Sequence, residues 1–476
     1  MTTDKGKVEE CLMRLFEQWS GEAVGDMVAL SANGSNRSYW RIVGATHRCI
    51  AAYNADVDEN EAFFYYSQAL KVRGIPVPEL YAIGDDRTIY LQQDLGDTTL
   101  YNLLFDKRRQ GVGFDSEMMG LYKKVMDDLA KMQVAGRDMD FRKAYPRTDF
   151  DAQSIQWDLN YFKYYFLKLR YIPFNEGLLE NDFHTFTNYL LEADCGFFMY
   201  RDFQSRNIML SEGQPFYIDY QGGRRGAAQY DAASILYSAK SDLPEPIRQE
   251  LLNHYIDSLN SRLAINKEQF RQRFYGYVLI RIMQALGAYG YRGYFEHKDY
   301  FLGSIPQAIR NLRLIVENHP LPIEIPHLRQ VWQKIIESED AQSPVATPAG
   351  LIVTITSFSF KKGLPVDSTG NGGGYVFDCR ALPNPGRYPE YRCYTGKDRP
   401  VIEFLEGDKE VEQFLTCTEQ LVGASISKYI ERNFTSLMVS FGCTGGQHRS
   451  VYCAERVAKW ILENFDCQVN IIHREQ

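Results

Sequence analysis

The chain has 476 residues, of which 45% are hydrophobic and 24% charged, and its formal net charge is −8. A single hydrophobic core rarely grows to this length, so two or three domains are expected. The acidic balance argues against broad electrostatic binding to nucleic acid or to an anionic membrane. The first ten residues are polar and contain no apolar signal segment, and no run of about 18 apolar residues predicts a membrane span. We therefore expect a cytoplasmic protein without a membrane partner.

The first two thirds of the chain begin with a β-rich pattern that becomes helical. Apolar and β-branched runs predict strands at residues 39–43, 49–53 and 89–92, and an amphipathic helix at 60–73. The same patterns predict later helices at 156–170, 183–191, 232–239 and 268–289, and short strands at 197–200 and 216–218 on either side of a polar loop. A small β-rich lobe over about residues 1–95 and a large helical lobe over about 96–337 are therefore predicted.

The clearest break in composition lies at residues 338–349, which are small, polar and proline-containing and predict an interdomain linker. Apolar strands are predicted beyond it at 351–357, 375–377 and 437–441, and an amphipathic helix at 449–463. Strands that alternate with helices predict a small α/β domain over residues 350–476. The nine scattered cysteines form no Cys-x-x-Cys pair, so we expect reduced thiols and no zinc site.

Three oxygen-bearing side chains stand at regular spacing beside the predicted strands at 197–200 and 216–218. Asp202 and Asn207 are five residues apart in the polar loop, and Asp219 follows twelve residues later. Phosphoryl transfer needs a carboxylate that accepts the proton of the attacking hydroxyl, and hard oxygen ligands that hold Mg²⁺ against the nucleotide phosphates. Asp202 suits the first task, and Asn207 and Asp219 suit the second.

This segment, 200-YRDFQSRNIML-210 with 217-YIDYQ-221, resembles the catalytic loop and the metal-binding aspartate of the aminoglycoside phosphotransferase and choline kinase superfamily. The Arg201–Asp202 pair is similar to the sugar-kinase branch. The resemblance implies an α+β, protein-kinase-like bilobal fold, with ATP and Mg²⁺ as cofactors and a sugar or amino sugar as the small-molecule acceptor. It also implies a structural role for Asp231, which would anchor the catalytic loop.

The resemblance further implies a set of nucleotide-binding residues in the small lobe. A turn before the first predicted strand would cover the nucleotide, and the segment between the lobes would meet the adenine. The residues at these positions are Gly34, Ser35, Asn36 and Arg37 in the turn, and Gln92 and Gln93 in the connecting segment.

One departure from the family pattern is the absence of a lysine in the strand at 48–53, where the α- and β-phosphates would be bound. The charge could come from Arg37, Arg41 or Arg48. The helix carboxylate, Glu59 or Glu61, would then lack its usual ion-pair partner. A pseudokinase that acts as a metabolite sensor or an RNA-binding adaptor is therefore an alternative function.

A second constellation, 442-GCTGGQHRS-450, links a predicted strand to a predicted helix. A glycine-rich turn at a helix N-terminus directs backbone N–H groups inward, and an arginine can hold two phosphate oxygens. The region from 351 to 474 resembles the C-terminal domain of the RapZ family, which implies a phosphosugar ligand and leaves RNA as a possible partner. The predicted phosphosugar-binding residues are Lys361, Arg380, Thr444, Gly445, Gly446, His448, Arg449 and Ser450.

RNA binding and phosphatase activity are two further candidate functions of this C-terminal region. From residue 348 onward there are 14 Lys and Arg against 15 Asp and Glu, so RNA binding is not favoured. The spacing of Cys443, Arg449 and Ser450 also matches cysteine phosphatase loops, in which a thiolate attacks phosphorus. A phosphatase is therefore the second alternative to a kinase with a C-terminal regulatory domain.

Overall fold

The computed structural model describes residues 5–30, 37–296, 298–342, 351–365, 373–432 and 434–475. The chain divides into two compact units, one formed by residues 1–291 with 304–339 and the other by residues 292–303 with 340–476. Most of the predicted linker, residues 343–349, lies outside the described residues. Among the helices of the described ranges, none has both the length and the apolarity needed to cross a bilayer.

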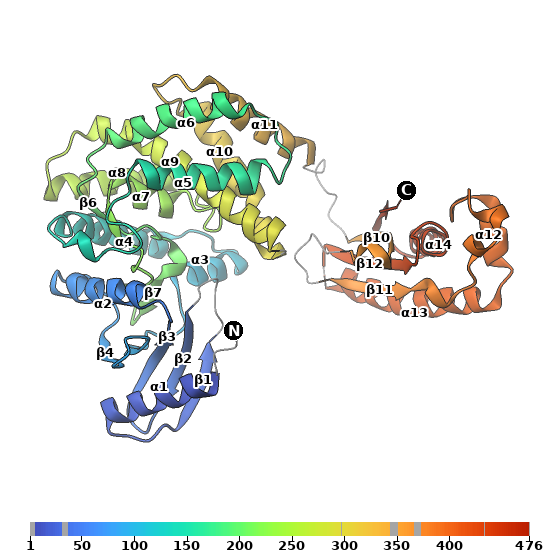
Figure 1. Ribbon diagram of the computed structural model, residues 1–476, viewed down its shortest axis with the longest axis horizontal. Coiled ribbons are helices and arrows are strands. Elements are labelled where there is room, and N and C mark those ends of the chain that lie inside the picture. The colour runs from blue at the N-terminus through green and yellow to red at the C-terminus, as the bar shows by residue number, and fades with distance from the viewer. Residues whose placement is uncertain are drawn as a thin grey trace. The chain divides into compact units, whose positions relative to one another are not determined.

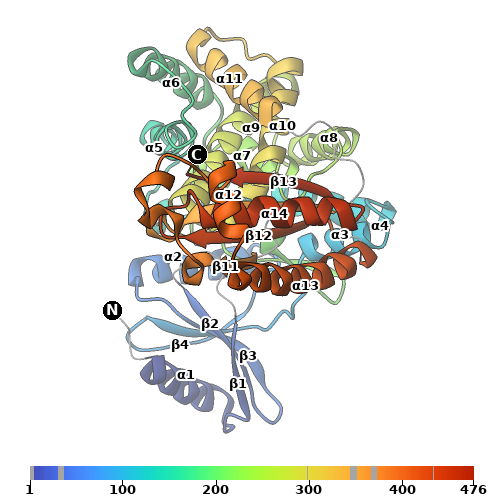
Figure 2. The same ribbon diagram turned by 90° about the vertical axis from the view of Figure 1, so that its right-hand side faces the viewer.

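The first lobe of the first unit is an antiparallel sheet with strand order β1-β2-β3-β5-β4 (Figure 1). Its strands are β1 (Asp26–Leu30), β2 (Ser38–Val43), β3 (Arg48–Tyr53), β4 (Leu80–Ile83) and β5 (Ile89–Gln92). The predictions for β2, β3 and β5 are accurate to within one residue, whereas β1 and β4 were not predicted. Helix α1 (Lys5–Ser20) packs along this sheet (Figure 2), with Leu12 and Phe16 fully buried against Trp40 and Ile42.

Helix α2 (Val57–Val72) connects the two halves of this sheet in sequence. Asp56 caps its N-terminus by accepting a hydrogen bond from the Glu59 N–H. The helix starts three residues earlier than the predicted range of 60–73, because the capping aspartate and the acidic first turn carry it beyond the apolar pattern.

The second lobe is helical and is built around α9, whose side chains are buried along most of its length. Its helices are α3 (Leu100–Arg109), α4 (Ser116–Ala135), α5 (Ala152–Phe162), α6 (Glu176–Leu191), α7 (Gln229–Leu236), α8 (Glu245–Arg262), α9 (Lys267–Gly290), α10 (Ile305–Asn318) and α11 (Pro326–Gln342). Gly290 lets α9 approach the end of α5, since a Cβ there would lie 1.9 Å from the Tyr165 carbonyl oxygen.

Two short strand pairs in this lobe hold the predicted catalytic segment. Strand β6 (Phe197–Met199) pairs with β9 (Arg224–Gly226), and β7 (Ile208–Ser211) pairs with β8 (Gln214–Tyr217), both antiparallel. The region predicted as one polar loop therefore contains β7. A four-residue strand with one buried side chain is too short to show an apolar period.

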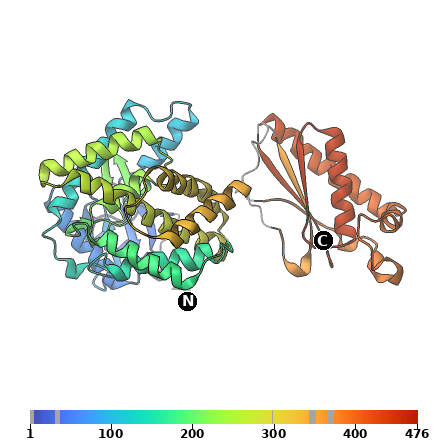
Figure 3. The same ribbon diagram turned by 90° about the horizontal axis from the view of Figure 1, so that it is seen from above.

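The second unit has a parallel sheet with strand order β11-β12-β10-β13. Its strands are β10 (Ile352–Ser359), β11 (Gly374–Asp378), β12 (Ser436–Cys443) and β13 (Gln468–His473), and its helices are α12 (Arg399–Glu406), α13 (Lys409–Glu431) and α14 (Arg449–Asn464). The helices lie on one face of the sheet (Figure 3), where α14 packs on β10, β12 and β13. The fold class is therefore the predicted one: a bilobal α+β unit followed by a small α/β unit.

Candidate functional site

Asp202, Asn207 and Asp219 come together where short strands of the helical lobe end or begin. Asp202 follows β6, Asn207 ends a 3₁₀ turn just before β7, and Asp219 follows β8. The Asn207 Nδ2 donates to the Asp202 carbonyl oxygen at 2.9 Å and to the Asp219 Oδ2 at 3.1 Å. Because both hydrogen bonds use the amide nitrogen, the amide oxygen of Asn207 is available to a ligand.

The backbone at this site is strained and is held by a buried carboxylate. Arg201 and Asp219 have φ angles of 80° and 71°, a left-handed region that side chains other than glycine rarely adopt. Asp231 accepts hydrogen bonds from the N–H groups of Tyr200 at 2.8 Å and Arg201 at 3.0 Å. Burial raises the pKa of Asp231 to about 7, although these donors oppose the rise. The predicted anchoring role of Asp231 is confirmed by these bonds.

The Asp219 carboxylate lies in an environment that favours a cation. Burial raises its pKa, the negative charge of Asp202 raises it further, and a 2.8 Å hydrogen bond from Gln221 together with the charges of Arg206 and Arg37 lowers it only in part. Within the described chain, no Lys or Arg forms an ion pair with Asp202 or Asp219.

The donor set at these residues suits Mg²⁺. In the described ranges, no group of three or more His, Cys, Asp or Glu side chains could hold a metal by itself. One carboxylate and one amide oxygen would therefore need water and substrate phosphates to complete the coordination, which is how Mg²⁺ is commonly bound with a nucleotide. Asn207 and Asp219 thus fit a metal ion that arrives with a phosphorylated substrate.

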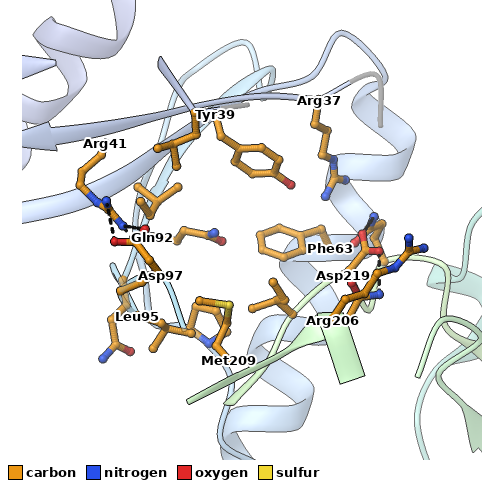
Figure 4. A pocket seen from close by; sticks show the side chains of 18 residues that line it. Arg37, Tyr39, Arg41, Phe63, Gln92, Leu95, Asp97, Arg206, Met209 and Asp219 are labelled. Carbon is orange, nitrogen blue, oxygen red and sulfur yellow. Dashed lines mark hydrogen bonds and ion pairs between the residues drawn. The ribbon is translucent and has the colours of Figure 1, made fainter. Parts of the chain in front are cut away.

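A cavity of about 320 Å³ lies beside Asn207 and Asp219 (Figure 4). Arg37, Arg206 and Asp219 gather at one end of it, and Leu95 lies at the other end with Asp97 (Figure 4). Apolar side chains from both lobes also line the cavity, namely Leu30, Ile50, Phe63, Pro78, Met209 and Ile218. This volume and this mixture of apolar walls and a few polar groups are typical of a small-molecule site.

Three of the predicted nucleotide-binding residues line this cavity: Arg37, Gln92 and Gln93. The other three, Gly34, Ser35 and Asn36, lie outside the described residues. Asp202 does not line the cavity, although Asn207 joins its backbone to Asp219. Asn207 and Asp219 therefore border the cavity, and Asp202 is linked to them through its backbone.

Arg37 lies buried beside α2 and lines the cavity. Its side chain is 2% exposed, and its Nη2 lies 3.7 Å from the Glu59 Oε2 on α2 and donates to the Asn60 Oδ1 at 3.5 Å. The guanidinium also lies 5.3 Å from the centre of the Phe63 ring. The usual lysine partner in β3 is absent, as expected, but both candidate helix carboxylates have another charged partner: Glu59 pairs with Arg37 and Glu61 pairs with Arg87.

The other two candidate arginines are engaged with the segment between the lobes. The Arg41 guanidinium donates to Asp94 at 2.8 Å and to Asp97 at 2.8 Å, and Arg48 lies 3.9 Å from Asp94. These contacts tie β2 and β3 to the segment that follows β5. Arg41 and Arg48 therefore neutralise local carboxylates, whereas Arg37 lies at the Asp219 end of the cavity (Figure 4).

Replacing Arg37 with alanine is expected to weaken nucleotide binding about 10- to 100-fold, the usual range for losing hydrogen bonds from a charged group. Isothermal titration with Mg·ATP measures the effect. Arg48→Gln is the matched control, since Arg48 is 66% exposed and was also a candidate for this charge. Equal weakening by both substitutions would contradict the assignment to Arg37.

The sequence analysis missed one charged residue of this site, Asp158 on α5. The Arg201 guanidinium donates to both of its oxygens, at 2.9 and 2.7 Å, and lies over the rings of Phe150 and Tyr230. The two residues are 43 positions apart, so no local pattern pairs them. An acidic residue within an otherwise apolar helical stretch was the available signal.

The glycine-rich loop of the second unit connects β12 to α14. The Cys443 Sγ lies 3.1 Å from the Ser450 Oγ and accepts a hydrogen bond from the Gly446 N–H at 3.1 Å. Burial raises the pKa of Cys443, but the hydrogen bonds from Ser450 and Gly446 and the charge of Arg449 outweigh it, so the net shift is downward. Gly446 has a φ of 74°, which suits the tight turn.

Arg449 is buried at the base of this loop and is 4% exposed. Its Nη1 donates to the carbonyl oxygens of Arg380 at 2.7 Å and Leu382 at 3.0 Å. Its Nε has no hydrogen-bond partner among the described residues. One side of the guanidinium therefore fixes the 379–382 turn, while the buried Nε has no partner among the described residues.

The remaining predicted phosphosugar-binding residues surround the same loop. The Thr444 carbonyl accepts a hydrogen bond from Ser359 at 2.7 Å, and the His448 Nε2 lies 3.1 Å from the Tyr391 carbonyl. The Arg380 side chain pairs with Asp378 at 2.6 Å. Lys361, Thr444 and Gly445 are exposed.

A lobe built on an antiparallel sheet, a helical lobe, and an acid–amide–acid cluster beside a cavity are typical of the kinase-like fold. The model of the phosphotransferase enzyme family matches residues 26–265, and the RapZ C-terminal domain model matches residues 351–476. The chain belongs to the phosphotransferase enzyme family and carries a RapZ C-terminal domain.

Curated relatives match the chain over part of its length. A nucleotide-binding protein of Dechloromonas aromatica is 40% identical over 149 residues, which cover 31% of this chain and 47% of that protein. One of Acidithiobacillus ferrooxidans is 43% identical over 127 residues, which cover 27% and 40%. The chain thus spans less than half the length of either relative.

Solved structures similar to this chain cover more of it at lower identity. The aminoglycoside phosphotransferase APH(4)-Ia is 16% identical, with a TM-score of 0.41 over 64% of this chain and 99% of that one. Choline kinase from Cryptosporidium parvum is 11% identical, with a TM-score of 0.46 over 69% and 99%.

Proposed function

We propose that the chain is an ATP- and Mg²⁺-dependent phosphotransferase that acts on a hydroxyl group of a sugar or amino sugar. The observation that carries the proposal is the hydrogen-bonded cluster of Asp202, Asn207 and Asp219 beside a cavity large enough for a nucleotide base. In phosphoryl transfer, the protein mainly positions the reactants and stabilises charge, and these three side chains with Arg37 meet that need.

Each residue has a distinct role in this proposal. Asp202 accepts the proton of the acceptor hydroxyl, because it is a carboxylate close to the metal ligands that does not itself line the cavity. Asn207 and Asp219 hold Mg²⁺, which would neutralise charge on the phosphates when bound. Arg37, fixed by Glu59, faces the same phosphates, and Gln92 and Gln93 lie at the base. Gly34, Ser35 and Asn36 would cover the nucleotide.

The second unit is proposed to bind a phosphosugar at the loop between β12 and α14. The N-terminus of α14 and the positive charge of Arg449 in its first turn suit an anionic group. The cysteine phosphatase alternative has less support, because Cys443 is 3% exposed and the Arg449 Nη1 is held by two carbonyl groups. The pseudokinase alternative also has less support. It was raised because β3 has no lysine to pair with the helix carboxylate, and Glu59 has a charged partner in Arg37.

The test is a screen for acceptor-dependent ADP formation with the full chain, Mg·ATP and a panel of sugars and amino sugars. The proposal expects turnover with at least one acceptor and none without Mg²⁺. Nucleotide binding without turnover across the whole panel would favour a pseudokinase instead.

Asp219→Asn is expected to raise the melting temperature of the metal-free protein by a few degrees at pH 8. The folded protein raises the pKa of Asp219, so the stability that protonation provides is present at low pH and is lost as the pH rises through the folded-state pKa. Asparagine does not titrate, so the variant keeps this stability as the pH rises. The substitution also removes a proposed metal ligand. Calorimetric scans at pH 5 and pH 8 in EDTA and then with Mg·ATP measure both effects.

Wild-type protein should gain more stability from Mg·ATP at pH 8 than at pH 5, and Asp219→Asn should gain little at either pH. Asp194→Asn is the matched control, since this carboxylate is 56% exposed and pairs with Arg137. A wild-type gain that is independent of pH would contradict the metal role of Asp219.

A further inference from the structure

Arg224, the first residue of β9, is a buried cation that has no anionic partner among the described residues. Its side chain is 7% exposed, and its one described hydrogen bond runs from Nε to the Gly222 carbonyl at 3.0 Å. No described residue accepts a hydrogen bond from either terminal nitrogen, and neither nitrogen is sealed from solvent. The guanidinium is therefore held through its Nε, while the planar fork formed by its two terminal nitrogens remains open to a ligand.

Without a ligand, the burial of this unpaired charge costs free energy. Burial and the positive charge of Arg201 lower the pKa of Arg224 to about 10, so it remains charged near neutral pH. The nearby Asp158 is already occupied, because both of its oxygens accept hydrogen bonds from Arg201. A buried charge is normally paired, and an unpaired one is a candidate for ligand binding.

The position of Arg224 assigns it to the acceptor side of the site. In the β6–β9 ladder Arg224 lies opposite Met199, three residues before Asp202, the proposed base. Its charge interacts with those of Arg201, Asp158 and Asp202. It does not line the cavity at Asn207 and Asp219, where Arg37 and Arg206 provide positive charge. An anion that Arg224 binds would thus lie beside Asp202 and would not be a phosphate of the nucleotide in that cavity.

A second polar atom without a partner lies near this position. The Tyr66 hydroxyl, on α2, is buried and has no hydrogen-bond partner in the described part of the chain. Burial raises the pKa of Tyr66, and the charge of Arg224 opposes this rise. An open guanidinium fork near an unsatisfied hydroxyl suits a ligand with several oxygen acceptors.

We infer that the acceptor carries an anionic group, a carboxylate or a phosphate, which the Arg224 fork binds while Asp202 faces the hydroxyl to be phosphorylated. The inference rests on the proposed phosphotransferase function and narrows its substrate class to hydroxylated acids. A planar guanidinium matches both oxygens of a carboxylate or a phosphate, which a lysine ammonium cannot do. Arg224 is thus a specificity-determining residue.

Matched ligands and a neighbouring control residue test the inference. Glucose, glucuronate and glucose 6-phosphate differ in their anionic group, and their binding to the full chain is measured by isothermal titration with a non-hydrolysable ATP analogue present. The variants are Arg224→Gln and Arg224→Lys. Arg225→Gln is the control, because Arg225 is the next residue on the same strand, is 51% exposed and pairs with Asp149.

Wild-type protein is expected to bind glucuronate or glucose 6-phosphate at least about 30-fold more tightly than glucose, the usual scale for a buried charge pair. Arg224→Gln should remove this preference, Arg224→Lys should retain part of it, and Arg225→Gln should leave it unchanged. The anionic sugar that shows the preference identifies the carboxylate or the phosphate as the group bound. Comparison of wild type with Arg224→Gln separates this site from the loop of the second unit.

The inference is overturned if wild type does not distinguish either anionic sugar from glucose, or if the preference survives in Arg224→Gln. Should Arg224→Gln not fold, an unchanged preference in Arg224→Lys overturns it equally. ADP formation is measured in parallel. An anion preference that depends on Arg224, without turnover of any acceptor, would contradict the proposed kinase activity while the anion site stands. Turnover without that preference would contradict the anion site alone.

Discussion

Asp202→Asn is expected to lower kcat for acceptor phosphorylation about 10²- to 10⁴-fold, the usual contribution of a general base. Asparagine keeps the size of the side chain but cannot accept the proton of the hydroxyl. The hydrogen bond from Asn207 goes to the Asp202 backbone carbonyl, so the substitution leaves that contact intact. The measurement is steady-state ADP release at saturating Mg·ATP and acceptor.

The binding of Mg·ATP provides the internal comparison for this substitution. Asp202 does not line the cavity, so the nucleotide affinity of Asp202→Asn should remain close to that of wild type. Asp194→Asn should leave both kcat and affinity unchanged. Equal kcat values for wild type and Asp202→Asn would refute the assignment of the base and with it the proposed mechanism.

Asp158→Asn is expected to destabilise the first unit by about 3–5 kcal/mol, because removing one partner of a buried ion pair leaves the other charge uncompensated. Arg201 would remain against the rings of Phe150 and Tyr230 with its two carboxylate hydrogen bonds weakened or lost. Differential scanning calorimetry of the full chain measures the effect on the transition that Mg·ATP shifts.

A double substitution separates the pair energy from the cost of the isolated charge. Asp158→Asn with Arg201→Met removes both charges, and it should recover much of the loss in melting temperature. Asp257→Asn is the control, since Asp257 is 69% exposed and pairs with Lys267 on the surface. If Asp158→Asn lowered the melting temperature no more than Asp257→Asn does, the result would show that Arg201 needs no charged partner. The rate of acceptor phosphorylation should also fall, because Asp158 holds Arg201, and Arg201 is the residue directly before the proposed base, Asp202.

Elements with a clear local signal in the sequence were predicted accurately, and elements with a weak or very short signal were missed. Strands β2, β3 and β5 were predicted closely because their apolar runs are continuous and end at clear turn residues. Helix α1 was missed, although Val8, Leu12, Leu15, Phe16 and Trp19 stand at helical spacing, because charged residues interrupt every turn. Strand β7 was missed because it has four residues.

The same contrast holds for the charged residues of the site. Asp202, Asn207 and Asp219 were predicted as a group because their order and spacing lie within 18 positions, and the structure joins them through one amide group. The pair of Arg37 with Glu59 was not predicted, because it depends on how the start of β2 faces α2. The candidates Arg41 and Arg48 have the same charge but different neighbours.

The sequence by itself determined the class of the chain: its two-part organisation, the order of its lobes and the three oxygen ligands of the proposed site. Those features depend on residues close together in the chain, where periodicity and spacing act directly. Only the tertiary structure decided which arginine lies at the Asp219 end of the cavity, which carboxylate neutralises Arg201, and that the terminal nitrogens of Arg224 have no partner among the described residues. These outcomes depend on helix packing and sheet pairing over tens of residues, since a charge is neutralised only by a group that folding brings within a few ångströms.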